Sequence, residues 1–325
     1  MQKRILAYGR LNDDQRAQLD QDFEVIHFPG LASADDPAFR AALADAHGLI
    51  GASLVITPEL LDAAPNLEAI ATISVGYDNY PVEELTRRGI LLCNTPDVLT
   101  ETTADTGFLL IMAAARRAVE LVELIKRGDW TAGIGPEHFG SDVHGKTLGM
   151  IGFGRIGAAV ARRGALGFGM RILYSNASPK PELEAELGAE RRELATLLAE
   201  ADIICVTVPL TAETRHLIGT REFARMKPSA IFVNIARGKV VNEAALIEAL
   251  EMGRIQAAGL DVFEQEPLSL ESPLPHMSNV VALPHVGSAT HETRTAMAQR
   301  AVDNLALALK GERPINLVNE AVWKT

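Results

Sequence analysis

Cysteine is scarce in this sequence. Only Cys93 and Cys205 occur among 325 residues, and each lies inside an apolar stretch. Two cysteines without metal-ligand spacing cannot build a disulfide framework or a zinc site. We therefore expect no metal and a location in the reducing cytoplasm.

Long apolar runs and clusters of basic residues are missing too. Residues 107–115 form the longest apolar run, far short of the roughly 20 residues that span a bilayer. Behind the basic start, residues 5–8 are too few for the core of a signal peptide. The net charge is −11, with Lys and Arg scattered along the chain, so we expect neither a membrane nor a nucleic-acid partner.

Short apolar runs alternate with longer segments of helical period, and this alternation occurs twice. The first series has candidate strands at 5–8, 24–28, 48–51, 69–73 and 90–93; the second has them at 147–151, 171–174, 203–208, 230–234, 257–261 and 280–283. Alternation of this kind is typical of a parallel sheet with crossover helices. The sequence thus predicts an α/β protein with two doubly wound parallel-sheet domains.

Two further helical segments suggest how the domains are connected. Residues 102–126 read as one long helix between the two series, and residues 291–311 as a helix that returns to the first domain. We expect a discontinuous first domain, residues 1–99 and 286–325, and a second domain of residues 100–285. The apolar stretch 108–118 within the long helix exceeds what one domain edge covers, and it predicts a homodimer.

A glycine-rich motif opens the second series. In Thr147-Leu-Gly-Met-Ile-Gly152-Phe-Gly154-Arg-Ile-Gly157, a GxGxxG pattern directly follows a strand and directly precedes a helix. Gly152 permits a tight turn, Gly154 lets the backbone approach a pyrophosphate, and Gly157 allows close packing of helix and strand. The motif predicts a dinucleotide-binding Rossmann domain.

The end of the next strand indicates which dinucleotide binds. An NAD enzyme normally carries Asp or Glu there for the ribose 2′-OH, but no acidic residue occurs between Ala158 and Pro181. Hydrogen-bond donors and positive charges are present instead: Ser175, Asn176, Ser178, Arg155 and Lys180. We expect NADP, with NAD at lower preference.

Three ionisable residues follow late strands, where open parallel sheets place their ligand sites. Arg237 lies between Ala236 and Gly238 and suits a fork for a substrate carboxylate. Glu266 and His285 follow the next two strands. His285 as imidazolium can donate a proton to a carbonyl oxygen, and Glu266 beside it would stabilise the charged ring.

Six ordered motifs spread over nearly the whole chain resemble the D-isomer-specific 2-hydroxyacid dehydrogenases, above all the branch of glyoxylate/hydroxypyruvate reductases and 2-ketogluconate reductases. Besides Gly152 to Gly157, they are Ser74-Val-Gly-Tyr-Asp-Asn79, Asn94-Thr-Pro-Asp-Val-Leu-Thr-Glu-Thr-Thr-Ala-Asp105, Val233-Asn-Ile-Ala-Arg-Gly238, Gly259-Leu-Asp-Val-Phe-Glu-Gln-Glu-Pro267 and Pro284-His-Val-Gly-Ser-Ala-Thr-His-Glu-Thr293. The resemblance implies a flavodoxin-like substrate domain beside the Rossmann domain, and a homodimer.

The resemblance also implies site residues. Arg237, Glu266 and His285 would be the catalytic set. Val75, Gly76 and Leu99 would join Arg237 and His285 at the substrate. Further nucleotide contacts are implied at Thr103, Arg155, Ile156, Val208, Pro209, Thr214, Ile235, Ala236, Asp261 and Gly287.

The expected function is the NADPH-dependent reduction of small 2-keto acids such as glyoxylate, hydroxypyruvate or 2-ketogluconate to D-2-hydroxy acids. Reduction of 2-keto-6-phosphogluconate stays open, because the sequence does not determine the volume of the substrate pocket. A dinucleotide-sensing binding protein on the same fold is the alternative from another class.

Overall fold

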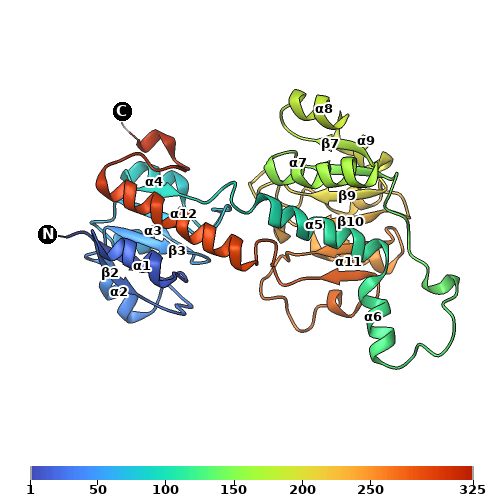
Figure 1. Cartoon of the computed structure of the whole chain (residues 1–325), viewed down its shortest axis with the longest axis horizontal. Helices are drawn as coiled ribbons and strands as arrows, with labels where there is room; N and C mark the ends of the chain where they lie inside the picture. Colours follow the sequence, from blue (N-terminus) through green and yellow to red (C-terminus); the bar gives the residue numbers. More distant parts are fainter. Residues whose placement is uncertain (1, 324–325) are drawn as a thin grey trace. The chain divides into compact units, whose positions relative to one another are not determined.

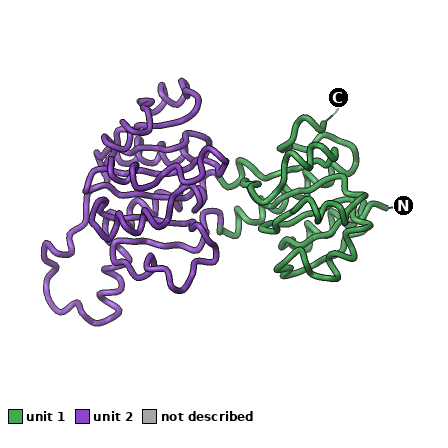
Figure 2. The backbone as a smooth tube through the Cα atoms, turned by 180° about the vertical axis from the view of Figure 1, so that it is seen from behind, with its two compact units in different colours: residues 1–99, 289–325 green, residues 100–288 purple. Residues whose placement is uncertain are grey.

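The computed structural model of the chain describes residues 2–323. It divides into two compact units, one of residues 1–99 and 289–325 and the other of residues 100–288 (Figure 2). The chain re-enters the first unit at Ala289.

The first unit is built on a parallel sheet in the order β2-β1-β3-β4-β5. Its strands are β1 (Arg4–Ala7), β2 (Glu24–His27), β3 (Gly48–Gly51), β4 (Ala69–Thr72) and β5 (Leu91–Cys93). Its helices are α1 (Asp13–Asp20), α2 (Pro37–Leu43), α3 (Pro58–Asp62), α4 (Val82–Arg88) and α12 (His291–Lys310). This strand order is that of flavodoxin-like folds, as expected.

Helix α12 completes the first unit from the far end of the sequence. Thr290 caps its start by accepting the N–H of Thr293, and Gly311 ends it with a positive φ of 76°. The helix packs against β3, β4 and β5 (Figure 1). Helix α12 therefore belongs to the first unit.

The second unit is built on a parallel sheet in the order β12-β11-β10-β9-β6-β7-β8. Its strands are β6 (Thr147–Ile151), β7 (Arg171–Ser175), β8 (Glu190–Arg191), β9 (Ile203–Val206), β10 (Ile231–Asn234), β11 (Ala257–Leu260) and β12 (Val280–Ala282). Its helices are α5 (Thr100–Ala115), α6 (Ala118–Lys126), α7 (Arg155–Arg162), α8 (Pro181–Leu187), α9 (Leu194–Glu200), α10 (Thr220–Phe223) and α11 (Glu243–Glu251). Numbered from β6, the order is 3-2-1-4-5-6 with a seventh strand, which is the Rossmann arrangement.

Alternate side chains of the central strands of this sheet enter two different hydrophobic cores. Met150 and Cys205 join one cluster, while Ile151 and Val206 join the other. Helices α5 and α7 contribute to the first core, and α9 and α11 to the second. The sheet is therefore covered on both faces, which explains why its strands read as continuous apolar runs.

Two predictions about this unit were wrong. Segment 102–126 is not one helix: α5 ends at Ala115, and Arg117 takes a left-handed conformation (φ 53°) before α6 begins (Figure 1). The short edge strand β8 was missed, because two residues, one of them Arg, carry no strand pattern that a sequence can show.

The C-terminal segment is held to the edge strand β5 by one side chain. Asn319 accepts the N–H of Leu92 at 2.8 Å and donates to the carbonyl of Ile90 at 2.8 Å. The Val318 N–H also donates to the Leu92 carbonyl. Asn319 is buried, so these backbone groups depend on it for their partners.

We expect Asn319→Ala to lower the free energy of unfolding by about 2–4 kcal/mol, because it leaves two buried backbone groups without partners. Urea denaturation followed by circular dichroism measures this. Asn66→Ala is the matched control, since Asn66 is exposed and bonds a single carbonyl, that of Ala44. An equal loss of stability in both variants would contradict the anchoring role.

Candidate active site

The catalytic candidates follow three adjacent strands. Arg237 comes after β10, Glu266 after β11 and His285 after β12, and these strands are neighbours in the sheet. Because the strands are parallel, the loops that carry these residues leave the sheet at the same carboxyl edge.

Glu266 and His285 form a hydrogen-bonded pair. Nδ1 of His285 lies 2.7 Å from Oε2 of Glu266, and the other carboxylate oxygen accepts the N–H of Phe263 at 3.0 Å. Both side chains are partly exposed, His285 by 46% and Glu266 by 36%. With Nδ1 engaged, Nε2 is the ring nitrogen left to exchange a proton with a substrate.

Glu266 stays ionised in this environment. Partial burial favours its neutral form, but the hydrogen bonds from His285 and Phe263, together with the charges of His285 and Arg237, outweigh burial and lower the pKa of Glu266. Arg237 itself lies on the loop after β10, the strand next to β11. Glu266 can therefore hold the histidine ring, Arg237 can bind an anion, and His285 can donate a proton.

Buried side chains that hydrogen-bond to the backbone support two of the three loops. The carboxylate of Asp261 accepts the N–H groups of Val286 at 2.7 Å and Gly287 at 2.8 Å, which holds the loop where His285 adopts a positive φ of 53°. Burial raises the pKa of Asp261 despite these hydrogen bonds. Asp261 was expected to contact the nucleotide, and here each of its oxygens already accepts a backbone hydrogen bond.

Asn234 holds the loop that carries Arg237 in the same way, and the sequence did not point to it. Its buried amide donates to the Arg237 carbonyl at 3.1 Å and accepts the N–H of Ala236 at 3.0 Å. A Cβ on Gly238 would lie 1.8 Å from the carbonyl carbon of Phe263. Only glycine therefore lets the loop after β10 pack on the loop after β11.

A second histidine–carboxylate pair, also missed, joins the loops behind the site. Nε2 of His216 lies 2.8 Å from Oε1 of Glu264, and the His216 N–H donates to the Lys239 carbonyl. Glu264 and Glu243 each accept the other's backbone N–H. The pair links the loops after β9, β10 and β11, and no sequence signal distinguishes it from ordinary surface residues.

The glycine-rich turn has the geometry that a dinucleotide needs. Gly152 has a φ of 91°, and a Cβ on Gly157 would lie 2.5 Å from the Gly152 carbonyl oxygen. A Cβ on Gly154 would meet nothing within 4 Å, so there is open space in front of the turn. Helix α7 follows without a side-chain cap, which leaves its first N–H groups to bind a pyrophosphate.

The remaining nucleotide candidates of the second unit also lie around this edge. Arg155 and Ile156 begin α7, Val208 and Pro209 follow β9, and Ile235 and Ala236 follow β10. Thr103 of α5 lies beside Gly287, with its Cγ2 3.3 Å from a Cβ built there. The Thr214 hydroxyl donates to the Pro209 carbonyl at 2.6 Å, so it shapes its own loop.

The loop after β7 differs from expectation at Asn176. Its side chain accepts the Phe153 N–H at 3.1 Å and donates to the Ser178 carbonyl at 2.9 Å. Asn176 thus ties the strand end to the glycine-rich turn rather than offering an unused donor. The backbone N–H of Lys180 donates a hydrogen bond to the Tyr174 hydroxyl at 3.0 Å.

The substrate candidates Val75, Gly76 and Leu99 belong to the first unit. Asn94 donates to the Val75 carbonyl at 2.9 Å, and the Ser74 hydroxyl donates to the Gly76 carbonyl at 2.6 Å. Among residues 2–323, neither the Val75 nor the Gly76 N–H has a hydrogen-bond partner. These two adjacent donors suit a carboxylate, whereas Leu99 is buried.

Within the described residues, no group of His, Cys, Asp or Glu is arranged to hold a metal ion. Nor is any helix in that part of the chain long and apolar enough to cross a membrane.

A Rossmann sheet with a histidine–carboxylate pair and an arginine at its carboxyl edge defines a nicotinamide-dependent oxidoreductase. The family model "D-isomer specific 2-hydroxyacid dehydrogenase, NAD binding domain" matches residues 108–287. The chain belongs to the D-isomer-specific 2-hydroxyacid dehydrogenase family.

Several relatives match the chain over nearly its whole length. Glyoxylate/hydroxypyruvate reductase B of Pectobacterium atrosepticum is 52% identical over 324 residues, 100% of each chain. A crystal structure of the NADPH-dependent glyoxylate/hydroxypyruvate reductase of Sinorhizobium meliloti, in complex with NADP and malonate, is 35% identical with a TM-score of 0.89, covering 100% of this chain and 99% of that one. A Thermus thermophilus protein structure is 40% identical with a TM-score of 0.89, covering 97% and 99%.

Substitution of Glu266 tests the pKa of this carboxyl. A pKa lowered by folding means that ionisation of Glu266 stabilises the protein above the unfolded value, and that this contribution is lost as the pH falls through the folded value. We expect the difference in Tm between the wild type and Glu266→Gln to shrink as the pH falls below the ordinary value of 4.5.

Thermal unfolding by circular dichroism at a series of acidic pH values measures that difference. Glu271→Gln is the control, because Glu271 is exposed and accepts no side-chain hydrogen bond among the described residues. If the Glu266→Gln difference changes with pH no more than the Glu271→Gln difference does, Glu266 has no depressed pKa.

Proposed function

We propose that this protein reduces small 2-keto acids, of the glyoxylate, hydroxypyruvate and 2-ketogluconate type, to D-2-hydroxy acids with NADPH. The observation that carries the proposal is the His285–Glu266 pair at 2.7 Å, with Arg237 on the loop after the neighbouring strand β10, at the carboxyl edge of a dinucleotide-binding sheet. The names of the relatives, glyoxylate/hydroxypyruvate reductase B and an NADPH-dependent reductase bound to NADP, support it.

The chain's own residues divide the chemistry among them. When bound, NADPH supplies the hydride that reduces the C2 ketone. His285 donates a proton from Nε2 to the oxygen of that ketone, and Glu266 holds Nδ1 and stabilises the imidazolium. Arg237 binds the substrate carboxylate and stabilises the charge that develops on the oxygen.

The two units take separate roles in this proposal. Unit 100–288 is the NADP-binding domain, and in the unit of residues 1–99 and 289–325 the adjacent Val75 and Gly76 N–H groups suit a carboxylate. NADP is preferred to NAD because the loop after β7 has no carboxylate between Ala158 and Pro181. We place the protein in the cytoplasm, since both cysteines are free and buried.

One assay series tests the function. NADPH oxidation is followed with glyoxylate, hydroxypyruvate, 2-ketogluconate and 2-keto-6-phosphogluconate, using the wild type and His285→Ala. We expect turnover of at least one acid, and a fall in kcat of at least about 100-fold in the variant while NADPH affinity is retained. Turnover of none would refute the enzyme assignment and favour a dinucleotide-sensing protein; near wild-type kcat in the variant would remove His285 from the mechanism.

We also propose a homodimer, from an apolar surface on the second unit. Helix α6 has no buried residue, and Val119, Val122 and Ile125 are 46%, 47% and 58% exposed at a spacing of three residues. Trp130 and Phe139, further along the chain, are 59% and 61% exposed. Exposed apolar side chains gathered in this way mark a protein interface.

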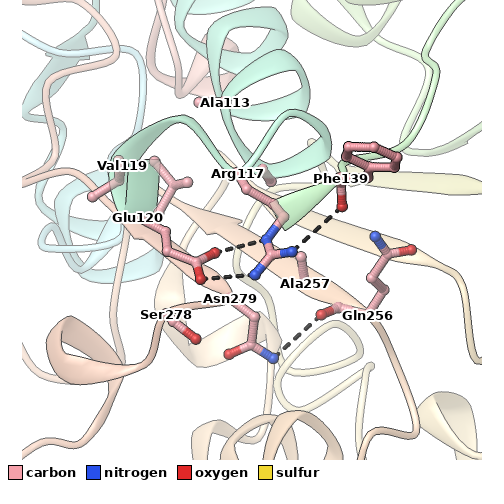
Figure 3. A pocket seen from close by; sticks show the side chains of 11 residues that line it. Ala113, Arg117, Val119, Glu120, Phe139, Gln256, Ala257, Ser278 and Asn279 are labelled. Carbon is pink, nitrogen blue, oxygen red and sulfur yellow. Dashed lines mark hydrogen bonds and ion pairs between the residues drawn. The ribbon is translucent and has the colours of Figure 1, made fainter. Parts of the chain in front are cut away.

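A pocket of about 210 Å³ adjoins this surface (Figure 3). Val119 and Phe139 line it together with the Arg117–Glu120 ion pair, whose atoms lie 2.7 Å apart. Its floor includes residues that directly precede β11 and β12, so it opens at the edge opposite the catalytic loops. We assign it to the second copy of the chain rather than to the substrate.

Light scattering is expected to give twice the chain mass of 35.0 kDa at micromolar concentration. Val122→Glu should shift the protein to the monomer, because it places a charge in the apolar contact. Leu270→Glu is the control: Leu270 is 98% exposed and lies away from α6 in sequence. A monomeric wild type would refute the dimer.

A further inference from the structure

Four arginines lie on or directly beside α7, β7 and β8, and one of them differs from the rest. Arg162 bonds Glu186 at 2.6 Å, while Arg171 and Arg192 both bond Glu190. Arg191 has no such partner: in residues 2–323 no carboxylate lies within salt-bridge distance of it. Its charge is the one in this group that no neighbouring acid balances.

Backbone carbonyls hold the Arg191 side chain in place. Nη2 donates to the carbonyl oxygens of Asn176 and Ala177, each at 3.1 Å. Strand β8 pairs with β7 in parallel, with Arg191 opposite Tyr174. The guanidinium therefore lies against the loop that follows β7, and its Nη1 and Nε have no hydrogen-bond partner among the described residues.

This loop is where a dinucleotide fold meets the adenosine ribose. A carboxylate at this position would accept the 2′-OH and repel a 2′-phosphate, and none is present from 159 to 180. A guanidinium with two free donor groups and an unbalanced charge matches a phosphate in geometry and in charge. The side chain is exposed, so an incoming ligand can reach it.

We propose that Arg191 is a specificity-determining residue that binds the 2′-phosphate of NADPH. The proposal rests on the proposed function for its choice of cofactor. The two carbonyl contacts hold the guanidinium in position before binding, which reduces the conformational entropy lost when the phosphate arrives.

A purely structural role for Arg191 makes a different prediction. If the residue only fastened the 176–177 loop, its loss would weaken NADPH and NADH alike, because both share the adenosine. A contact with the 2′-phosphate weakens only the ligands that carry this group. The ratio of the two affinities therefore separates the two roles.

The experiment measures binding by isothermal titration calorimetry, without turnover. The ligands are NADPH, NADH, adenosine 2′,5′-bisphosphate and 5′-AMP, and the variants are Arg191→Gln, Arg191→Lys and the control Arg192→Gln. We expect Arg191→Gln to raise the Kd of NADPH and of the bisphosphate about tenfold, as for a lost charge-assisted hydrogen bond at an exposed site. The Kd of NADH and of 5′-AMP should change less than about twofold.

The Kd of NADPH for Arg191→Lys should lie between those of the wild type and Arg191→Gln, since lysine keeps the charge and loses the bidentate guanidinium geometry. It also covers the case in which Arg191→Gln does not fold. Arg192→Gln should leave the affinity ratio unchanged, because the Arg192 charge is already paired with Glu190.

Equal weakening of NADPH and NADH, or no weakening of either, would overturn the proposal. Different results would refute the proposed function and the assignment of Arg191. Arg191-dependent binding of the bisphosphate without reduction of any keto acid would refute the proposed function alone. Reduction of keto acids with NADPH that is indifferent to Arg191 would refute the assignment of Arg191 alone.

Discussion

Parallel pairing of β10, β11 and β12 is the constraint on which the candidate active site depends. It sends the carboxyl ends of the three strands to one edge, so that Arg237, Glu266 and His285, far apart in the chain, lie on neighbouring loops. The pairing is stable because both faces of the sheet are buried beneath helices. The chemistry of the site thus rests on the same apolar packing that stabilises the domain.

Buried polar groups, and not apolar packing alone, determine the conformation of those loops. Asp261 holds the two N–H groups that follow His285, and Asn234 holds the turn that leads to Arg237. Gly238 lets two of the loops approach to contact distance. These contacts hold the loops that carry the candidate catalytic residues.

The candidate cofactor site depends on glycines in one turn and on the charges around the loop after β7. Gly152 and Gly157 shape the turn, and Gly154 leaves the space where a pyrophosphate would approach. The loop after β7 has no negative charge of its own. Its conformation depends on Asn176 from within and on Arg191 from the neighbouring strand.

Elements that depend on local pattern could be predicted from the order of residues. Strand and helix alternation, the glycine-rich turn and the missing carboxylate are all properties of contiguous residues. From such local features came the α/β class, the Rossmann domain and the choice of Arg237, Glu266 and His285 as candidates, while the flavodoxin-like sheet was implied by the family resemblance. The folded chain alone reveals the break at Arg117, the two-residue strand β8, and the partners of Asn176, Asp261 and Arg191. These depend on hydrogen bonds between segments distant in the chain, or on a strand too short to leave a pattern, and neither can be read from the order of residues.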